Sequence, residues 1–245
     1  MKILILAAGY GTRLYPLIKD KPKALLEVNG KPLIGHIIDR IKALSGISEL
    51  VVVTNDKFSA DFSAWSQTVD GLSFPITIVN DGTTTPENRL GSIGDINFVL
   101  QHRKMDEDVL VVGSDNLFDF CIDAYIIFAE RNKPHASIGL YDIHDRQQAK
   151  LYGVAVLDES GKVVSFEEKP SAPRSTLVAM CFYYFPQGSL RLIPRFIKEG
   201  HKADKAGDYI RWLTEKDVVY GFKFTGKWYD IGSMESYHEA KRYFR

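Results

Sequence analysis

The sequence predicts an α/β protein in which helices flank a mostly parallel, Rossmann-like central sheet and a smaller antiparallel lobe is inserted later. Apolar runs at residues 3–6, 50–53 and 109–112 are typical of parallel strands that are buried on both faces. Segments with helical periodicity separate these runs, which indicates right-handed βαβ units. Two further short runs flank a turn at residues 159–162, and this pattern predicts the antiparallel lobe.

The composition is that of a globular protein without a strong electrostatic field. The chain has 245 residues, of which 45% are hydrophobic, and its 31 basic and 31 acidic residues balance to a net charge of zero. This length fits a single domain spanning residues 1–245. A neutral chain argues against a nucleic-acid partner and against a membrane surface held by basic residues, so local cations would have to meet phosphate groups. The sequence leaves open whether the chain forms a homo-oligomer.

The cysteines and the start of the chain indicate a reducing compartment. Cys121 and Cys181 are far apart and belong to no CxxC pattern, so we expect both to be small core residues. Met1 and Lys2 lead directly into the first strand, and no apolar run is long enough to span a bilayer. We therefore expect a cytoplasmic protein without a signal peptide.

A loop rich in small residues follows the first strand and is a candidate anion site. Small residues let a backbone lie close to a large anion and direct its N–H groups at it. Arg13 adds a planar guanidinium and Lys23 a point charge, a combination suited to a polyphosphate. The residues expected to bind a nucleotide here are Leu6, Ala7, Ala8, Gly9, Gly11, Thr12 and Arg13.

A dinucleotide-binding loop is the competing interpretation of this stretch. Gly9 and Gly11 have the spacing of that motif, but its third glycine would fall at Leu14. The strand predicted at residues 51–54 runs into Asn55 instead of the acidic residue that would bind a ribose. The dinucleotide interpretation is therefore disfavoured.

The remaining elements follow from periodicity and turn residues. We expect helices at residues 32–45, 58–69, 92–103, 119–132, 189–199 and 207–215. We expect further strands at residues 75–79, 136–141, 177–185 and 218–224. Ser92 and Ser233 are expected to cap the helices that they begin, and Gly161 to supply a positive φ angle at its turn.

Two polar segments follow strands of the predicted parallel sheet. Residues 80–91 come after one strand and Asp115 after another, and such positions line the ligand crevice of an open α/β sheet. The first segment is a candidate base-reading loop, and Asp115 is placed to hold Mg²⁺ against phosphate oxygens. The alternatives are a mobile surface loop at residues 83–88 and a solvated turn at Asp115.

Four stretches resemble the motifs of the sugar-1-phosphate nucleotidylyltransferases, a family that includes the glucose-1-phosphate thymidylyltransferases. The first, LAAGYGTRLYPLIKDKPKALLEVNGKPLI, spans residues 6–34 and departs at Ile18, where the family usually has Thr. The others are SDN at residues 114–116, YGVAVLDESGKVVSFEEKP at 152–170 and WYDIGSMESYHEA at 228–240. The resemblance implies the fold of the nucleotide-diphospho-sugar transferases.

The resemblance also implies roles for particular residues. Asp115 and Asp230 would be the two ligands of Mg²⁺, and Arg13 and Lys23 the catalytic cations. Gly91 would contact the nucleotide, although the Gln that precedes it in the family has no clear counterpart here. The residues implied in binding the sugar and its phosphate are Tyr152, Gly153, Glu168 and Lys169.

The resemblance therefore predicts a Mg²⁺-dependent nucleotidylyltransferase that joins an NTP, dTTP or UTP, to a sugar 1-phosphate such as glucose 1-phosphate. Residues 1–142 would form the nucleotide-binding half, residues 150–225 the sugar-phosphate lobe and residues 226–245 the C-terminal metal-ligand segment. Two alternatives stay open: a CTP-dependent cytidylyltransferase acting on phosphocholine or inositol phosphate, and a non-catalytic regulatory subunit of the same fold. Within the lobe, Glu167 and Lys169 have the alternative of an ordinary exposed strand pair.

Overall fold

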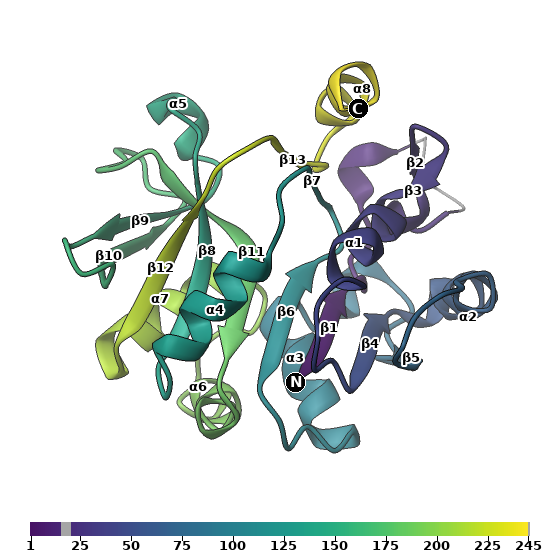
Figure 1. Ribbon diagram of the computed structural model, residues 1–245, viewed down its shortest axis with the longest axis horizontal. Helices are drawn as coiled ribbons and strands as arrows, with labels where there is room; N and C mark the ends of the chain where they lie inside the picture. Colours follow the sequence, from purple (N-terminus) through teal and green to yellow (C-terminus); the bar gives the residue numbers. More distant parts are fainter. Residues whose placement is uncertain (16–20, 245) are drawn as a thin grey trace. The chain divides into compact units, whose positions relative to one another are not determined.

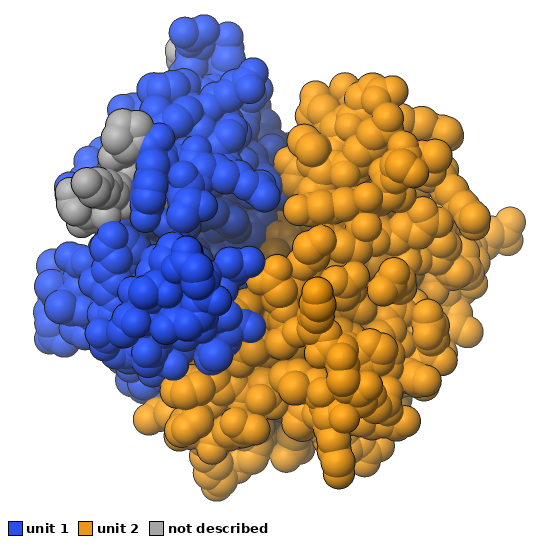
Figure 2. All heavy atoms as spheres, turned by 180° about the vertical axis from the view of Figure 1, so that it is seen from behind, with its two compact units in different colours: residues 1–90, 112–122, 226–245 blue, residues 91–111, 123–225 orange. Residues whose placement is uncertain are grey.

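The computed structural model describes residues 1–15 and 21–244, and the chain divides into two compact units (Figure 2). The first unit consists of residues 1–90, 112–122 and 226–245, and the second of residues 91–111 and 123–225. The C-terminal segment thus belongs to the same unit as the glycine-rich loop. The second unit includes residues that we expected in a nucleotide-binding half, and the functional labels of the two parts remain predictions. Pro16 and Ile18 of the opening motif lie outside the described residues.

The first unit is built on parallel strands. β1 (Lys2–Leu6), β4 (Glu49–Thr54) and β5 (Ile76–Asn80) lie side by side and run parallel (Figure 1). Every residue of β4 is buried, as its continuous apolar sequence predicts for a strand with neighbours on both sides. The three strands expected in this region are confirmed, each within one residue at either end.

Two helices accompany these strands, and both are shorter than predicted. α1 (Leu33–Ile41) buries residues at helical spacing, but it ends four residues before the expected position. α2 (Ser59–Ser66) begins only after a 3-10 turn, η3 (Asp56–Phe58). Asn55 caps that turn because its Oδ1 accepts a hydrogen bond from the N–H of Phe58 at 3.1 Å. The side chains that α1 buries are Leu33, Ile34, Ile37, Ile38 and Ile41.

The second unit is dominated by antiparallel strands, which confirms the predicted lobe. Its strands are β8 (Ala136–Asp142), β9 (Gly153–Leu157), β10 (Val163–Glu168), β11 (Leu177–Phe185) and β12 (Val219–Phe224). β10 pairs with β9, β9 with β11 and β11 with β8 in antiparallel fashion, whereas β12 runs parallel to β8. Gly161 has a φ angle of +82° between β9 and β10, as the turn requires.

One strand is divided between the two units. The first three residues of β6 (Val109–Gly113) belong to the second unit. Its last two residues belong to the first unit. All five residues of β6 are buried, which agrees with the apolar run expected at residues 109–112.

Helices accompany the strands of the second unit. They are α3 (Ser92–His102), α4 (Asp123–Arg131), α5 (Arg146–Ala149), α6 (Leu192–Lys198) and α7 (Ala206–Lys216). In Figure 1, α4 lies in front of β8 and β12, and α7 lies behind them. Aromatic rings pack between α4 and the strands, where the ring centroids of Tyr125 and Phe224 are 5.3 Å apart. No helix in residues 1–15 and 21–244 combines the length and apolar character needed to cross a bilayer.

An apolar cluster joins the glycine-rich loop to the C-terminal segment within the first unit. Its elements include β2 (Glu27–Val28), β7 (Asn116–Phe118), β13 (Trp228–Asp230) and α8 (Met234–Tyr243). β2 pairs with β3 (Lys31–Pro32). The buried residues of the cluster are Leu14, Leu26, Val28, Leu33, Leu117, Ile231, Tyr237, Ala240 and Phe244. Several of them adjoin predicted site residues in sequence, as Leu14 adjoins Arg13 and Ile231 adjoins Asp230. Burial of these side chains therefore fixes the backbone that carries the charged groups.

The expectation that both cysteines are core residues is wrong. Cys121 is exposed and Cys181 is half-buried, and no disulfide joins the two. Cys181 has a φ angle of +56° where the register of β11 against β8 shifts between Ala179 and Tyr183. From Leu177 to Phe182 the residues of β11 alternate between half-buried and buried, and Cys181 lies on the half-buried face with Leu177 and Ala179.

Candidate functional site

Two glycines shape the loop that follows β1. Gly9 is exposed, and a Cβ built on it would meet no atom of the described residues within 4 Å. Gly11 has a φ angle of +59°, a left-handed conformation that glycine adopts without strain. The start of the loop is held to the sheet, because Asn55 Nδ2 donates a hydrogen bond to the buried Ala8 carbonyl at 2.9 Å. Of the other predicted residues, Leu6 is half-buried, Ala7 buried and Thr12 exposed.

Arg13 is an exposed cation at the end of this loop. It lies in the 3-10 turn η1 (Thr12–Leu14), whose last residue, Leu14, is buried in the apolar cluster. Within residues 1–15 and 21–244, no carboxylate forms an ion pair with its guanidinium. The turn therefore places a guanidinium, which can bind paired oxygens of an anion, at the end of the glycine-rich loop.

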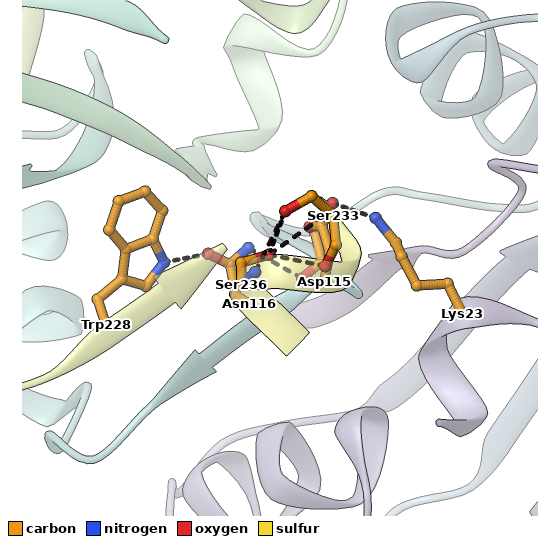
Figure 3. A network of polar contacts seen from close by, with 7 residues as sticks. Lys23, Asp115, Asn116, Trp228, Ser233 and Ser236 are labelled. Carbon is orange, nitrogen blue, oxygen red and sulfur yellow. Dashed lines mark hydrogen bonds and ion pairs between the residues drawn. The ribbon is translucent and has the colours of Figure 1, made fainter. Parts of the chain in front are cut away.

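Lys23 and Asp115 form an ion pair, although 92 positions separate them in sequence (Figure 3). Lys23 begins the 3-10 turn η2 (Lys23–Leu25), and Asp115 lies in the turn between β6 and β7. Lys23 Nζ lies 2.7 Å from Asp115 Oδ2, and the two side chains are 17% and 33% exposed. A predicted phosphate-binding cation and a predicted metal-binding carboxylate thus lie in contact with each other.

A small antiparallel pair brings Asp230 beside Asp115. β13 pairs with β7 so that Asp230 lies opposite Asn116, the residue after Asp115. The N–H of Ile231 also donates to the carbonyl of Asp115 at 3.0 Å. A side-chain bond strengthens the pairing, because Trp228 Nε1 donates to Asn116 Oδ1 at 2.6 Å (Figure 3). The backbone positions of the two predicted metal ligands therefore adjoin each other.

The chain that follows Asp230 is fixed by a helix cap. The N–H of Ser236 donates to Ser233 Oγ at 3.2 Å, and the N–H of Ser233 donates to Ser236 Oγ at 3.1 Å. This reciprocal arrangement starts α8 and confirms Ser233 as its N-cap. Together with the burial of Tyr237, the cap anchors the segment that carries Asp230.

The loop after β5 is held by its own polar contacts. Asp81 and Thr83 are buried, and both the N–H and the hydroxyl of Thr83 donate to Asp81 Oδ1 at 2.7 Å. The hydroxyl of Tyr10, between the two loop glycines, lies 3.4 Å from Thr83 Oγ1. Within the loop, the 3-10 turn η4 (Pro86–Asn88) is capped reciprocally by Thr85. These contacts give the loop a defined conformation, while its predicted role in reading a base stays a prediction.

Gly91 and Ser92 follow this loop and begin the second unit. The prediction that Ser92 caps α3 is wrong, because Gly91 occupies the cap position and no side chain caps the helix. The carbonyls of Ala203 and Asp204 accept hydrogen bonds from the first N–H groups of α3 instead. Gly91 has a φ angle of +78°, and a Cβ on it would overlap the backbone of Asp204. A tertiary contact therefore explains the glycine at this position.

The four predicted sugar-phosphate residues lie together in the second unit. Glu168 pairs with Gly153 across β9 and β10, and the N–H of Lys169 donates to the carbonyl of Tyr152 at 2.9 Å. Burial raises the pKa of the Glu168 carboxyl above its ordinary value, against the lowering effect of the positive charge of Lys169. The alternative of a Glu167 and Lys169 strand pair does not describe this region, because Lys169 lies beyond the end of β10 with a φ angle of +50°.

Sequence reasoning missed how these groups are connected. Asn116 and Trp228 each matched a family motif, but nothing in either motif indicates that the two side chains bond to each other. The ion pair of Lys23 with Asp115 was also missed. The sequence did contain a signal for this ion pair. The motif with Lys23 and the motif with Asp115 were predicted to meet the same ligand, and their side chains carry opposite charges, which attract each other at short distance.

Comparison with known proteins identifies the class of protein. The family model described as nucleotidyl transferase matches residues 2–245, so the chain belongs to the nucleotidyl transferase family. This match confirms the resemblance that the four motifs indicated. Among curated proteins, the UTP–glucose-1-phosphate uridylyltransferase AglF of Haloferax volcanii is 32% identical over 99% of this chain and 96% of its own length. The bifunctional protein GlmU of Methanocaldococcus jannaschii is 24% identical over 99% of this chain, which covers 54% of that protein.

Solved structures show the same fold. A structure from Bacillus anthracis assigned as a glucose-1-phosphate thymidylyltransferase has a TM-score of 0.80 and 24% identity, over 99% of this chain and 94% of that one. A UDP-glucose pyrophosphorylase complexed with UDP-glucose also has a TM-score of 0.80, with 20% identity over 98% of this chain and 97% of its own. At these identities the likeness is one of fold, and it confirms the predicted α/β architecture.

Proposed function

We propose that the protein transfers a nucleotidyl group from UTP or dTTP to glucose 1-phosphate or a related sugar 1-phosphate, with Mg²⁺ as cofactor. The observation that carries this proposal is the ion pair of Lys23 with Asp115 beside the backbone of Asp230. This pair brings a cation and a carboxylate next to the backbone of a second aspartate, in the unit that also contains the glycine-rich loop. The 32% identity to a UTP–glucose-1-phosphate uridylyltransferase supports the choice of substrates.

The reaction needs positioning and charge neutralisation, and it needs no protein nucleophile. An oxygen of the sugar phosphate forms a bond to the α-phosphorus of the NTP. The bond between that phosphorus and the oxygen bridging to the β-phosphate breaks, and pyrophosphate leaves with the electron pair. Arg13 and Lys23 would neutralise the triphosphate, and Lys169 would hold the attacking phosphate. Fixed cations that meet developing charge lower the barrier without reorganising during the reaction.

The residues present fit a bound Mg²⁺. Mg²⁺ takes oxygen ligands and often only one or two protein carboxylates, with water and phosphate oxygens completing its shell. Asp115 and Asp230 supply two carboxylates, and in the described part of the chain no group of three or more acidic, His or Cys side chains offers a larger cage. When bound, Mg²⁺ would supply positive charge against the phosphate oxygens. Lys23 would then exchange Asp115 for phosphate as its partner.

The remaining predicted residues would receive the sugar 1-phosphate. The carboxylate of Glu168 is half-buried at the end of β10 and suits a hydrogen bond from a sugar hydroxyl. Lys169 is exposed directly beside it and suits the phosphate. The backbones of Tyr152 and Gly153 border the same position through their pairing with these residues.

A pyrophosphate-release assay with purified protein tests the proposal. Each of UTP, dTTP, CTP, ATP and GTP is combined with glucose 1-phosphate, other sugar 1-phosphates, phosphocholine and inositol phosphate in the presence of Mg²⁺. We expect the highest kcat/KM for UTP or dTTP with a sugar 1-phosphate. A preference for CTP with a non-sugar phosphate would replace this proposal by the cytidylyltransferase alternative. Absence of pyrophosphate in every combination would indicate a non-catalytic subunit.

A further inference from the structure

Two glycines enclose the carboxylate of Glu168. A Cβ built on Gly207 would overlap its Oε2 and would lie 2.8 Å from its Cδ. A Cβ built on Gly153 would approach the same oxygen to 3.3 Å. The space in which the carboxylate lies is therefore the space that a side chain at position 207 would fill.

The backbone of Gly207 gives no other reason for a glycine. Gly207 is buried in the first turn of α7, and it is not among the glycines with a positive φ angle. Alanine is more favourable than glycine in an ordinary helical position. The glycine at position 207 is explained instead by the Glu168 carboxylate, which occupies the space that a larger side chain at position 207 would fill.

The start of α7 cannot readily move away from Glu168, because it is bonded to the start of α3. The N–H of Ser92 donates to the carbonyl of Asp204 at 3.1 Å, and the N–H of Ile93 donates to that of Ala203 at 3.0 Å. The N–H of Ala206 in turn donates to Ser92 Oγ at 3.2 Å. A side chain introduced at position 207 would therefore displace the carboxylate instead of the helix.

Burial and neighbouring positive charges shift the pKa of the Glu168 carboxyl in opposite directions. Burial is the main influence and raises the pKa of its carboxyl, and the charge of Asp208 acts in the same direction. The positive charges of Lys169, Lys205 and Arg211 act in the opposite direction. Movement of the carboxylate into solvent would remove the burial and change its titration.

We infer that Gly207 is a positioning residue, which leaves the space that holds the Glu168 carboxylate in place for the sugar 1-phosphate. This inference deepens the proposed function and rests on it, because it takes Glu168 to be a sugar-contacting residue. Gly207 would act only through Glu168 and would not contact the substrate itself.

Kinetics of four variants test the inference. Gly207→Ala should raise the KM for glucose 1-phosphate roughly tenfold or more, because a hydrogen bond to a charged group is lost, while the KM for the NTP stays near that of the wild type. Glu168→Ala should have at least that effect, and Gly207→Ala should add nothing in the Glu168→Ala background. Gly188→Ala is the matched control, since a Cβ there would meet no atom of the described part of the chain within 4 Å, and it should behave as the wild type. Independent losses from Gly207→Ala and Glu168→Ala would overturn the inference.

An NMR titration of Glu168 separates this inference from the proposed function. In Gly207→Ala the pKa of the Glu168 carboxyl should fall towards the ordinary value of a glutamate, whether or not the protein is active. An unchanged pKa would overturn the positioning role. A lowered pKa with an unchanged KM for glucose 1-phosphate would instead overturn the proposed contact of Glu168 with the sugar.

If Gly207→Ala does not fold, folding of the double variant Gly207→Ala with Glu168→Ala tests whether Glu168 is the reason for the glycine. Removal of the glutamate side chain gives an alanine at position 207 the space that it lacks, so Gly207→Ala with Glu168→Ala should fold with a Tm near that of Glu168→Ala. Failure of the double variant to fold would show that something other than Glu168 requires the glycine.

Discussion

Changing both Asp115 and Asp230 to Asn should cost little more turnover than the worse of the two single changes. Each single change should lower kcat by about 100-fold or more, since loss of one group that stabilises developing charge commonly has that effect. The losses should not add, because the two carboxylates would act together on a single Mg²⁺. Turnover of the two single variants and the double variant, measured over a range of Mg²⁺ concentrations, provides the check.

A binding measurement makes this prediction independent of activity. Mn²⁺ binding followed by electron paramagnetic resonance, in the presence of the NTP, should weaken in both single variants. Asp61→Asn is the control, because Asp61 is an exposed carboxylate on α2 of the same unit and should leave both turnover and Mn²⁺ binding unchanged. Additive losses of turnover, or undiminished Mn²⁺ binding in Asp115→Asn, would refute the metal assignment.

Arg13→Ala should raise the barrier of the chemical step by roughly 3–4 kcal/mol, and Arg13→Lys should restore only a small part of the loss. The reason is geometric, since a planar guanidinium can donate two parallel hydrogen bonds to phosphate oxygens and an ammonium cannot. The measurement is kcat with all substrates saturating.

A conservative change elsewhere provides the control for Arg13. Arg40 lies on the last turn of α1 in the same unit, and Arg40→Lys removes a guanidinium without touching the glycine-rich loop. It should leave kcat unchanged. Wild-type kcat in Arg13→Ala, or full recovery in Arg13→Lys, would exclude a role for the guanidinium in the chemical step.

The sequence was most informative where a single local property decides the structure. The apolar run of β4 predicted a buried strand, because few other arrangements satisfy such a run between two turns. It was less informative where tertiary contacts decide. The serine predicted to cap α3 does not cap it, because the carbonyls of Ala203 and Asp204 reach the same N–H groups from more than a hundred positions away. Cys181 is half-buried because it lies on the face of β11 that Leu177 and Ala179 share, and an uninterrupted apolar sequence does not reveal which face is the less buried one.

In the candidate site, too, the sequence predicted local features well and tertiary contacts poorly. The glycine-rich loop could be identified from sequence, since Gly11 has the left-handed backbone that its residue type permits. The neighbouring backbones of Asp115 and Asp230 were expected only because both aspartates occur in motifs of one family. Their proximity depends on the pairing of β7 with β13, which two three-residue strands of ordinary composition do not predict. The role of Gly207 was not predicted, because its cause is a side chain from another strand.

The stereochemical course at phosphorus tests the central claim most directly. The measurement uses the preferred NTP, carrying sulfur on the α-phosphate in one configuration, together with the preferred sugar 1-phosphate, and determines the configuration of the product by ³¹P NMR. Direct in-line attack of the sugar phosphate on the α-phosphorus predicts a thio-substituted nucleoside-diphosphate sugar with inverted configuration. Retention would show two successive displacements through an enzyme-bound intermediate, and it would contradict a mechanism in which the protein supplies only position and charge.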